Sequence, residues 1–164
     1  VPCVNTFGSS TTFATGSRPV SITSGYFDSD TVLDLAIVNS GSNNVDVFLG
    51  NGDGTFRSQG TNTVGTNPSF VITNSFNNDN ISDVVTVNVG SNTVSVLLGN
   101  GNGTFQTAKP YNTGPNPTSV TSGDFNSDAI QDLAVTNADS DTVGILLGNG
   151  NSTFRNQVVY QTGG

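Results

Sequence analysis

Aspartate residues gather in three short segments of the chain, and these segments carry the groups that could do chemistry. All twelve acidic residues are Asp, and eight of them lie in three nine-residue segments spaced 49 residues apart. We name these segments loop 1 (26–34), loop 2 (75–83) and loop 3 (124–132), and number their positions one to nine. Carboxylates at alternating positions of a tightly curled loop are typical of sites for Ca²⁺, which takes six to eight oxygen ligands.

Loop 3 carries the fullest set of oxygen ligands. Its candidate ligands, at positions 1, 3, 5, 7 (through the backbone carbonyl) and 9, are Asp124, Asn126, Asp128, Ile130 and Asp132. Clustered carboxylates repel one another, and a divalent cation would relieve that repulsion. The alternative is that each Asp caps a turn by bonding its own backbone. Three acids in one short loop exceed what capping needs, so we expect calcium in loop 3.

Loops 1 and 2 each lack the acid at position 1, which is Tyr26 in loop 1 and Ser75 in loop 2. The ligands that remain in loop 1 are Asp28, Asp30, the carbonyl of Val32, and Asp34. Those that remain in loop 2 are Asn77, Asp79, the carbonyl of Ile81, and Asp83. With one charged ligand lost, calcium affinity should fall, or a water molecule must replace the missing group. The sequence leaves occupied and empty loops equally open.

The same 49-residue period organises the whole chain. Position 2 of each loop is Phe, and a second series of Phe residues keeps the period half a repeat away, at Phe7, Phe56, Phe105 and Phe154. A period near 50 indicates a solenoid or a propeller. We therefore divide the chain into an outer strand of a preceding blade and three repeats, the last ending in its own outer strand: 1–16, 17–65, 66–114 and 115–164.

Each repeat is expected to form four short strands. The first follows a Gly-x-x-Pro corner, because Pro lacks a backbone donor and suits a strand entrance. The second, such as 34–38, is almost continuously apolar, which is typical of a strand covered on both faces. The third ends in a Gly-Asn-Gly or related turn that favours a tight hairpin. The following Thr-Phe should begin the fourth strand, with its Phe filling the space between neighbouring blades.

Composition supports an all-β fold and argues against nucleic-acid binding and membrane-spanning helices. The chain has no Glu, His, Met or Trp, only four basic residues, and a formal net charge of −8. So few basic residues argue against nucleic acid as a partner, and no apolar run reaches the length of a membrane-spanning helix. The Asn- and Thr-rich, Lys-poor composition favours a secreted or cell-surface protein. The single Cys3 is a free thiol, a link to another chain, or half of a bond that this sequence does not contain.

These motifs resemble the FG-GAP repeats of integrin α-subunit propellers, also called VCBS-type repeats. The matching pieces are the Gly-x-x-Pro corner, the D-F-N-x-D-x-x-x-D loop, the L-A-V-x-N strand and the L-L-G-N-G-[DN]-G-T-F turn. The resemblance implies a β-propeller whose blades each hold calcium in the loop between their first two strands. The family usually has Gly at position 6, where this chain has Thr31, Asn80 and Ala129. Thr and Ala tolerate positive φ poorly, so these loops either curl differently or bind calcium more weakly.

Three repeats cannot close a typical propeller ring, which has four to eight blades. The chain is therefore expected to be a fragment of a larger propeller or to assemble with copies of itself, most simply as a dimer that closes a six-bladed ring. We expect a non-catalytic, calcium-binding extracellular module for protein interaction or adhesion. The alternatives are a lectin-like propeller that binds a glycan and an accessory domain of a larger secreted enzyme. Catalysis by the chain itself is not expected, because its candidate acids are repeated and accounted for by the loops.

Overall fold

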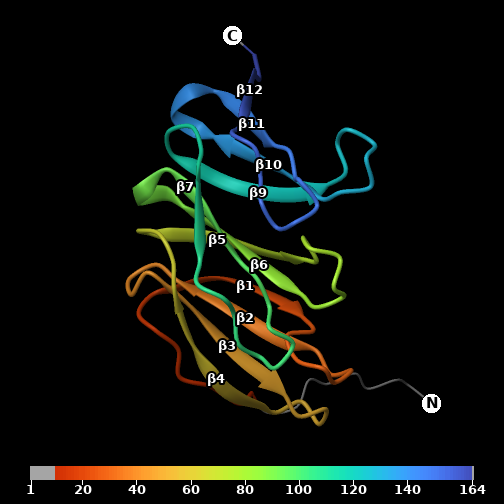
Figure 1. The fold of residues 1–164 in the computed structure, drawn as a ribbon. Coiled ribbons are helices and arrows are strands. Elements are labelled where there is room, and N and C mark those ends of the chain that lie inside the picture. Colours follow the sequence, from red (N-terminus) through yellow and green to blue (C-terminus); the bar gives the residue numbers. More distant parts are fainter. Residues whose placement is uncertain (1–9, 164) are drawn as a thin grey trace, which may run out of the picture.

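The computed structural model describes residues 10–163, which form three sheets of four antiparallel strands with almost no helix (Figure 1). The predicted all-β, blade-like fold is thereby confirmed. Blade 1 contains β1 (Pro19–Gly25), β2 (Asp34–Asn39), β3 (Asn44–Gly50) and β4 (Phe56–Thr63). Blade 2 contains β5 (Pro68–Asn74), β6 (Asp83–Asn88), β7 (Thr93–Leu97) and β8 (Lys109–Asn112), with a 3₁₀ turn, η1 (Val89–Ser91). Blade 3 contains β9 (Pro117–Gly123), β10 (Asp132–Asn137), β11 (Thr142–Leu146) and β12 (Val158–Gln161), with η2 (Ala138–Ser140).

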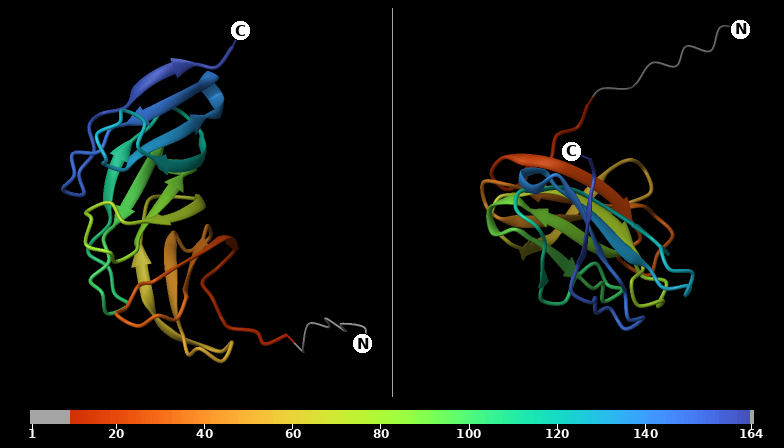
Figure 2. Two further views of the ribbon diagram at one scale, coloured as in Figure 1. Left: turned by 90° about the vertical axis from the view of Figure 1, so that its right-hand side faces the viewer. Right: turned by 90° about the horizontal axis from the view of Figure 1, so that it is seen from above.

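Within each sheet the strands lie side by side in chain order. The first strands of successive blades contact one another, β1 with β5 and β5 with β9, so they form the inner edge of the stack. Figure 2 shows the three sheets stacked one upon the next, from blade 1 near the N-terminal end to blade 3 near the C-terminal end. Each first strand begins at the Pro of its Gly-x-x-Pro corner, as the sequence predicts.

Two apolar cores fill the spaces between the blades. The core between blades 1 and 2 is built on Phe27, Ala36, Val38, Val45, Val47, Leu49, Val71, Val84 and Leu97. The core between blades 2 and 3 is built on Phe76, Val85, Val87, Val94, Val96, Val120, Leu133, Val135, Leu146 and Phe154. All six residues of β6 are buried, because blade 2 has a neighbour on each face. Blade stacking therefore explains the continuous apolar runs of the second strands.

The fourth strands differ from the expectation that each begins at Thr-Phe. β4 does begin at Phe56, but Phe105 and Phe154 form only isolated bridges, to Gly99 and Gly148, and β8 and β12 begin later. In blade 1 a β-bulge absorbs the extra residue beside Gly60, which has a φ of 155°. The equivalent residues of blades 2 and 3, Lys109 and Val158, carry side chains that disfavour this backbone conformation. The hydrogen-bond ladder of the fourth strand is interrupted there instead.

The predicted outer strand at the N-terminal end is only partly within the described residues. Residues 10–16, which were predicted to belong to an outer strand, form no strand. Cys3, Phe7 and the rest of the predicted outer strand up to residue 9 lie outside the described residues.

Within residues 10–163, no helix is long and apolar enough to cross a membrane.

Candidate functional site

The three Asp loops lie between the first and second strand of each blade, as predicted: loop 1 joins β1 to β2, loop 2 joins β5 to β6, and loop 3 joins β9 to β10. Because the blades stack in the same orientation, the loops follow one another along the same end of the molecule. Neighbouring loops also touch: the N–H of Ser82 in loop 2 donates to the carbonyl oxygen of Tyr26 in loop 1 at 3.0 Å.

The Asp at position 9 is buried and joins its loop to a hairpin in the same blade. In loop 3 the two carboxylate oxygens of Asp132 accept hydrogen bonds from the backbone N–H groups of Phe125 (2.9 Å) and Gly148 (2.8 Å). Asp34 and Asp83 bond their own loops and hairpins in the same way. All three Asp residues are 0% exposed. Position 9 is therefore a structural clamp, a role that the sequence analysis did not anticipate.

Burial has an electrostatic cost at one of these clamps. It raises the pKa of Asp83 to about 6. The hydrogen bonds from the backbone N–H groups of Phe76 and Gly99 lower this pKa in part, and the negative charge of Asp79 raises it by a smaller amount. A cation near this carboxylate would favour its charged form and lower the pKa again.

The Asp at position 5 closes a tight turn in every loop. Asp30, Asp79 and Asp128 each accept a hydrogen bond from the backbone N–H two residues further on, at 2.8, 2.8 and 2.9 Å. This geometry is an Asx turn, so the capping interpretation holds for one oxygen of each carboxylate. The residues at position 3 lie close by: in loops 2 and 3 the amide of Asn77 donates to Asp79 at 2.6 Å and that of Asn126 to Asp128 at 2.9 Å.

Loop 3 is curled around the carboxylate of Asp124. One oxygen of this carboxylate accepts from the N–H of Asp128 at 3.1 Å, and the other from the N–H of Ala129 at 2.9 Å. The bond from Ala129 is the main reason that the pKa of Asp124 lies below its usual value. Loop 3 thus gathers the exposed oxygens of Asp124, Asn126 and Asp128 in one turn, while Asp132 lies beneath them in the clamp.

Loop 1 has a different backbone from loops 2 and 3. Within the described part of the chain, positions 4 and 6 have positive φ in loop 2 (Asn78, Asn80) and in loop 3 (Ser127, Ala129), but not in loop 1. The missing Gly at position 6 therefore has two different consequences. Loop 1, with Thr31 at this position, is curled differently, and loop 3 holds Ala129 in a left-handed conformation that costs an L-residue energy. Asp28 of loop 1 also pairs with Arg57 of β4, with 3.6 Å between nitrogen and oxygen.

The carboxylates of a single loop do not converge on one point. In residues 10–163, no three Asp or Cys side chains are placed to hold a metal ion together. A cation in loop 3 would thus depend on Asn126 and on a backbone carbonyl, such as that of Ile130, beside two carboxylates.

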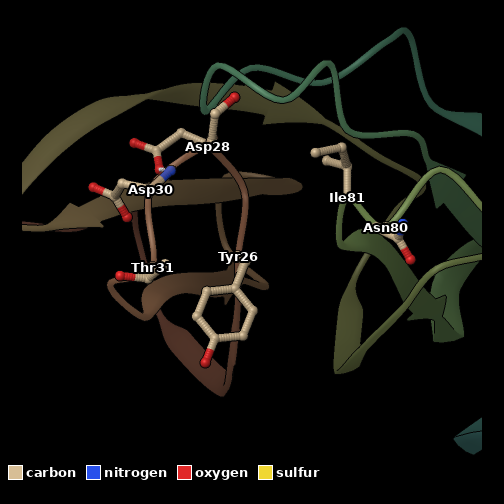
Figure 3. A pocket seen from close by; sticks show the side chains of 7 residues that line it. Tyr26, Asp28, Asp30, Thr31, Asn80 and Ile81 are labelled. Carbon is tan, nitrogen blue, oxygen red and sulfur yellow. Dashed lines mark hydrogen bonds between the residues drawn. The ribbon is translucent and has the colours of Figure 1, made fainter.

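A surface pocket of about 430 Å³ lies between loops 1 and 2 (Figure 3). Its lining residues are Tyr26, Asp28, Ser29, Asp30, Thr31, Asn80 and Ile81. Figure 3 shows the Asp28 and Asp30 side chains close together on loop 1, with Asn80 and Ile81 on the loop opposite. Tyr26 is 46% exposed. The sequence analysis assigned Tyr26 only to a lost ligand position, and its exposure beside a second loop becomes visible only in the folded chain.

The sheets and their loops define a protein class, the stacked blades of a β-propeller-like repeat. Residues 76–135 match the family model of the FG-GAP-like repeat, so this part of the chain is similar to FG-GAP-type repeats, as the motifs predicted. The match begins at Phe76 in loop 2 and ends at Val135 on β10, and it therefore spans more than one 49-residue period. A comparison with curated proteins finds no match.

Proposed function

We propose that the chain is a non-catalytic, calcium-binding blade module of an extracellular protein, which presents its loop-bearing end to a protein partner. The observation that carries this proposal is the turn of loop 3, where the oxygens of Asp124, Asn126 and Asp128 are exposed and gathered around one short stretch of backbone. These oxygens also accept hydrogen bonds within the loop: those of Asp124 from Asp128 and Ala129, and those of Asp128 from Ile130 and the amide of Asn126. Because the oxygens are exposed as well as hydrogen-bonded, they can still face a cation from the solvent side.

The donor chemistry of loop 3 fits a hard cation. Carboxylate, amide and carbonyl oxygens are the ligands that Ca²⁺ takes in proteins, and loop 3 offers all three kinds through Asp124, Asp128, Asn126 and Ile130. Calcium there would neutralise the carboxylates and hold the loop in one conformation. Asp132 contributes by fixing both ends of the loop, because its carboxylate already bonds Phe125 and Gly148.

Loops 1 and 2 fit calcium less well, for two different reasons. Loop 2 has the same curl as loop 3 but lacks an acid at position 1. Loop 1 lacks the acid and also the curl, and its Asp28 pairs with Arg57. We therefore propose an order of calcium affinity of loop 3 over loop 2 over loop 1.

Calorimetric titration of calcium into EDTA-stripped protein tests this proposal. Asp128→Asn should abolish the tightest binding event, and Asp139→Asn, a substitution of an exposed Asp outside the loops, should leave it intact. Equal titrations of the two variants would contradict a site in loop 3.

The second candidate function is glycan binding, which the pocket of Figure 3 favours. An exposed Tyr ring beside carboxylate and amide groups offers stacking together with hydrogen bonding. A glycan array with the intact chain and with Tyr26→Ser, which places the loop 2 residue at position 1 of loop 1, separates the two candidates. Saccharide binding that Tyr26→Ser abolishes would favour the lectin-like function, and an array with no bound glycan would favour the protein-interaction module.

A further inference from the structure

The stack of three blades contains two blade–blade interfaces and ends in two faces that no described residue of a further blade covers (Figure 2). One free face belongs to blade 1 and the other to blade 3. The 49-residue register assigns to each side chain on a free face its equivalents inside the stack. Comparing their exposure shows what the free faces are built to contact.

The free face of blade 1 carries apolar side chains that a preceding blade would bury. Ile22 on β1 is 60% exposed, whereas its register equivalents Val71 and Val120, each covered by the blade before it, are 4% and 3% exposed. Leu33 at position 8 of loop 1 is 49% exposed. Its equivalents are polar residues that bond the preceding blade: Ser82 accepts from the N–H of Tyr26, and Gln131 from the amide of Asn74. The free face of blade 1 is thus more apolar than the equivalent faces of blades 2 and 3, which are buried against a preceding blade.

The free face of blade 3 carries the complementary aromatic residues. Phe125 is 50% exposed, whereas its equivalents Phe27 and Phe76 are 0% and 4% exposed. Each of these two rings is covered by the Phe that precedes the fourth strand of the next blade: Phe27 packs on Phe105, and Phe76 packs on Phe154.

The outer strands repeat this relationship with a second aromatic residue. Tyr111 on β8 packs edge-on against Phe154 of the following blade, with ring centroids 5.4 Å apart. Tyr160, its register equivalent on β12, is 56% exposed because no blade follows it among the described residues.

Phe13 shows that blade 1 can receive such an aromatic ring. Phe13 stands 98 residues, or two periods, before Tyr111 in the sequence. It packs edge-on against Phe56 of blade 1 with centroids 5.9 Å apart, just as Tyr111 packs against Phe154. The N-terminal segment therefore occupies, within the same chain, a place that belongs to the outer strand of a preceding blade.

We propose that the free face of blade 3 docks on the free face of blade 1 of a second copy of this chain. Phe125 and Tyr160 of one copy then cover Phe56 and Ile22 of the other, and Phe13 leaves Phe56 to Tyr160. A blade of a second copy fits each free face, because every pair in this contact has a register equivalent in the blade–blade interfaces inside the chain. The inference goes beyond the proposed function and does not depend on calcium.

The contact is head-to-tail, since it joins two different faces, and such contacts form a ring only when the rotation closes. Two copies supply six blades, which lies within the four to eight blades that propellers use. A closed dimer also covers both free faces at once and leaves no exposed apolar face of the kind that favours aggregation.

Sedimentation equilibrium of the whole chain tests the proposal, with EDTA to exclude calcium and a reductant to keep Cys3 from linking copies. We expect a concentration-dependent mass that reaches twice the 16.8 kDa of the chain. Ile22→Asp and Tyr160→Asp, on opposite free faces, should each hold the mass at that of one chain. Val159→Asp is the matched control, because Val159 is 48% exposed and, since successive side chains of a strand alternate, points to the other side of β12 from Tyr160.

Three outcomes would overturn the proposal. The first is a chain that stays at the mass of one copy at every concentration. The second is a dimer that Ile22→Asp dissociates but Tyr160→Asp does not, which indicates a contact between two blade 1 faces. The third is a dimer that both variants leave intact. Circular dichroism establishes that each variant is folded, and Ile22→Ser replaces Ile22→Asp if the latter unfolds.

Discussion

The carboxylate of Asp132 accepts a hydrogen bond of 2.8 Å from the backbone N–H of Gly148, sixteen residues further along the chain. This bond fastens loop 3 to the hairpin that follows β11, and the second oxygen of Asp132 holds the N–H of Phe125. The same pair of bonds recurs in all three blades. The position 9 Asp is thus a part of the fold as well as a candidate ligand.

Asp132→Asn should destabilise the calcium-free protein. The NH₂ group of Asn would point at a backbone N–H, and two donors cannot form a hydrogen bond. Leaving one buried N–H without an acceptor costs about 1–3 kcal/mol, and thermal or urea unfolding in EDTA measures this loss. Asp128→Asn is the matched control, since its carboxylate is exposed and its cap can be made by Asn. Equal unfolding midpoints for the two variants would contradict the clamp.

Ala129→Gly should stabilise the protein and strengthen calcium binding. Ala129 has a φ of 63°, and this left-handed conformation costs an L-residue about 1 kcal/mol more than it costs Gly. Urea unfolding measures the gain, and calorimetry measures the tighter binding. Ala138→Gly, at an exposed position outside the left-handed region, should instead lose stability. A loss at both positions would show that Ala129 is not strained.

Phe105→Ala should weaken the interface between blades 1 and 2. Phe105 packs edge-on against the buried Phe27, with ring centroids 5.1 Å apart. Removal of a packed Phe side chain costs about 3 kcal/mol, which denaturant unfolding resolves. Phe125→Ala is the control at the register equivalent of Phe27, because Phe125 is already 50% exposed and the monomer should lose much less stability. A comparable loss at Phe125 would contradict the account of the free face of blade 3.

Phe13→Ser should tighten self-association of the chain. In the folded chain Phe13 covers Phe56, so a second copy must displace it before Tyr160 can dock. Removing the competing ring should shift the dissociation midpoint in sedimentation to lower protein concentration. A midpoint that moves to higher concentration would mean that Phe13 belongs to the dimer contact and does not compete with it.

The repeat made most of the fold predictable from the sequence. Pro19, Pro68 and Pro117 placed the first strands, and the apolar runs after Asp34, Asp83 and Asp132 placed the second strands. The ends of the fourth strands were not predictable, because they depend on a bulge that only Gly60 permits. That distinction lies in backbone torsion and not in hydrophobic pattern.

The candidate site was predictable in position but not in the way its oxygens are used. The spacing placed Asp124, Asp128 and Asp132 in one loop, yet it could not reveal that Asp132 turns inward to the hairpin of Gly148. Nor could it reveal that Ala129 takes a positive φ while Thr31 does not. These outcomes depend on contacts between segments sixteen or more residues apart and on how tightly each loop is curled.

Calcium titration of EDTA-stripped protein by calorimetry tests the central claim most directly, with the stoichiometry per chain as the readout. The account predicts a tightest binding event of one ion per chain that Asp124→Asn and Asp128→Asn both abolish and Asp139→Asn preserves. Weaker events, if present, should survive in these two variants, because they belong to loops 2 and 1. An absence of binding at millimolar calcium would contradict the account and leave the Asp loops as turn caps and clamps of a purely structural repeat.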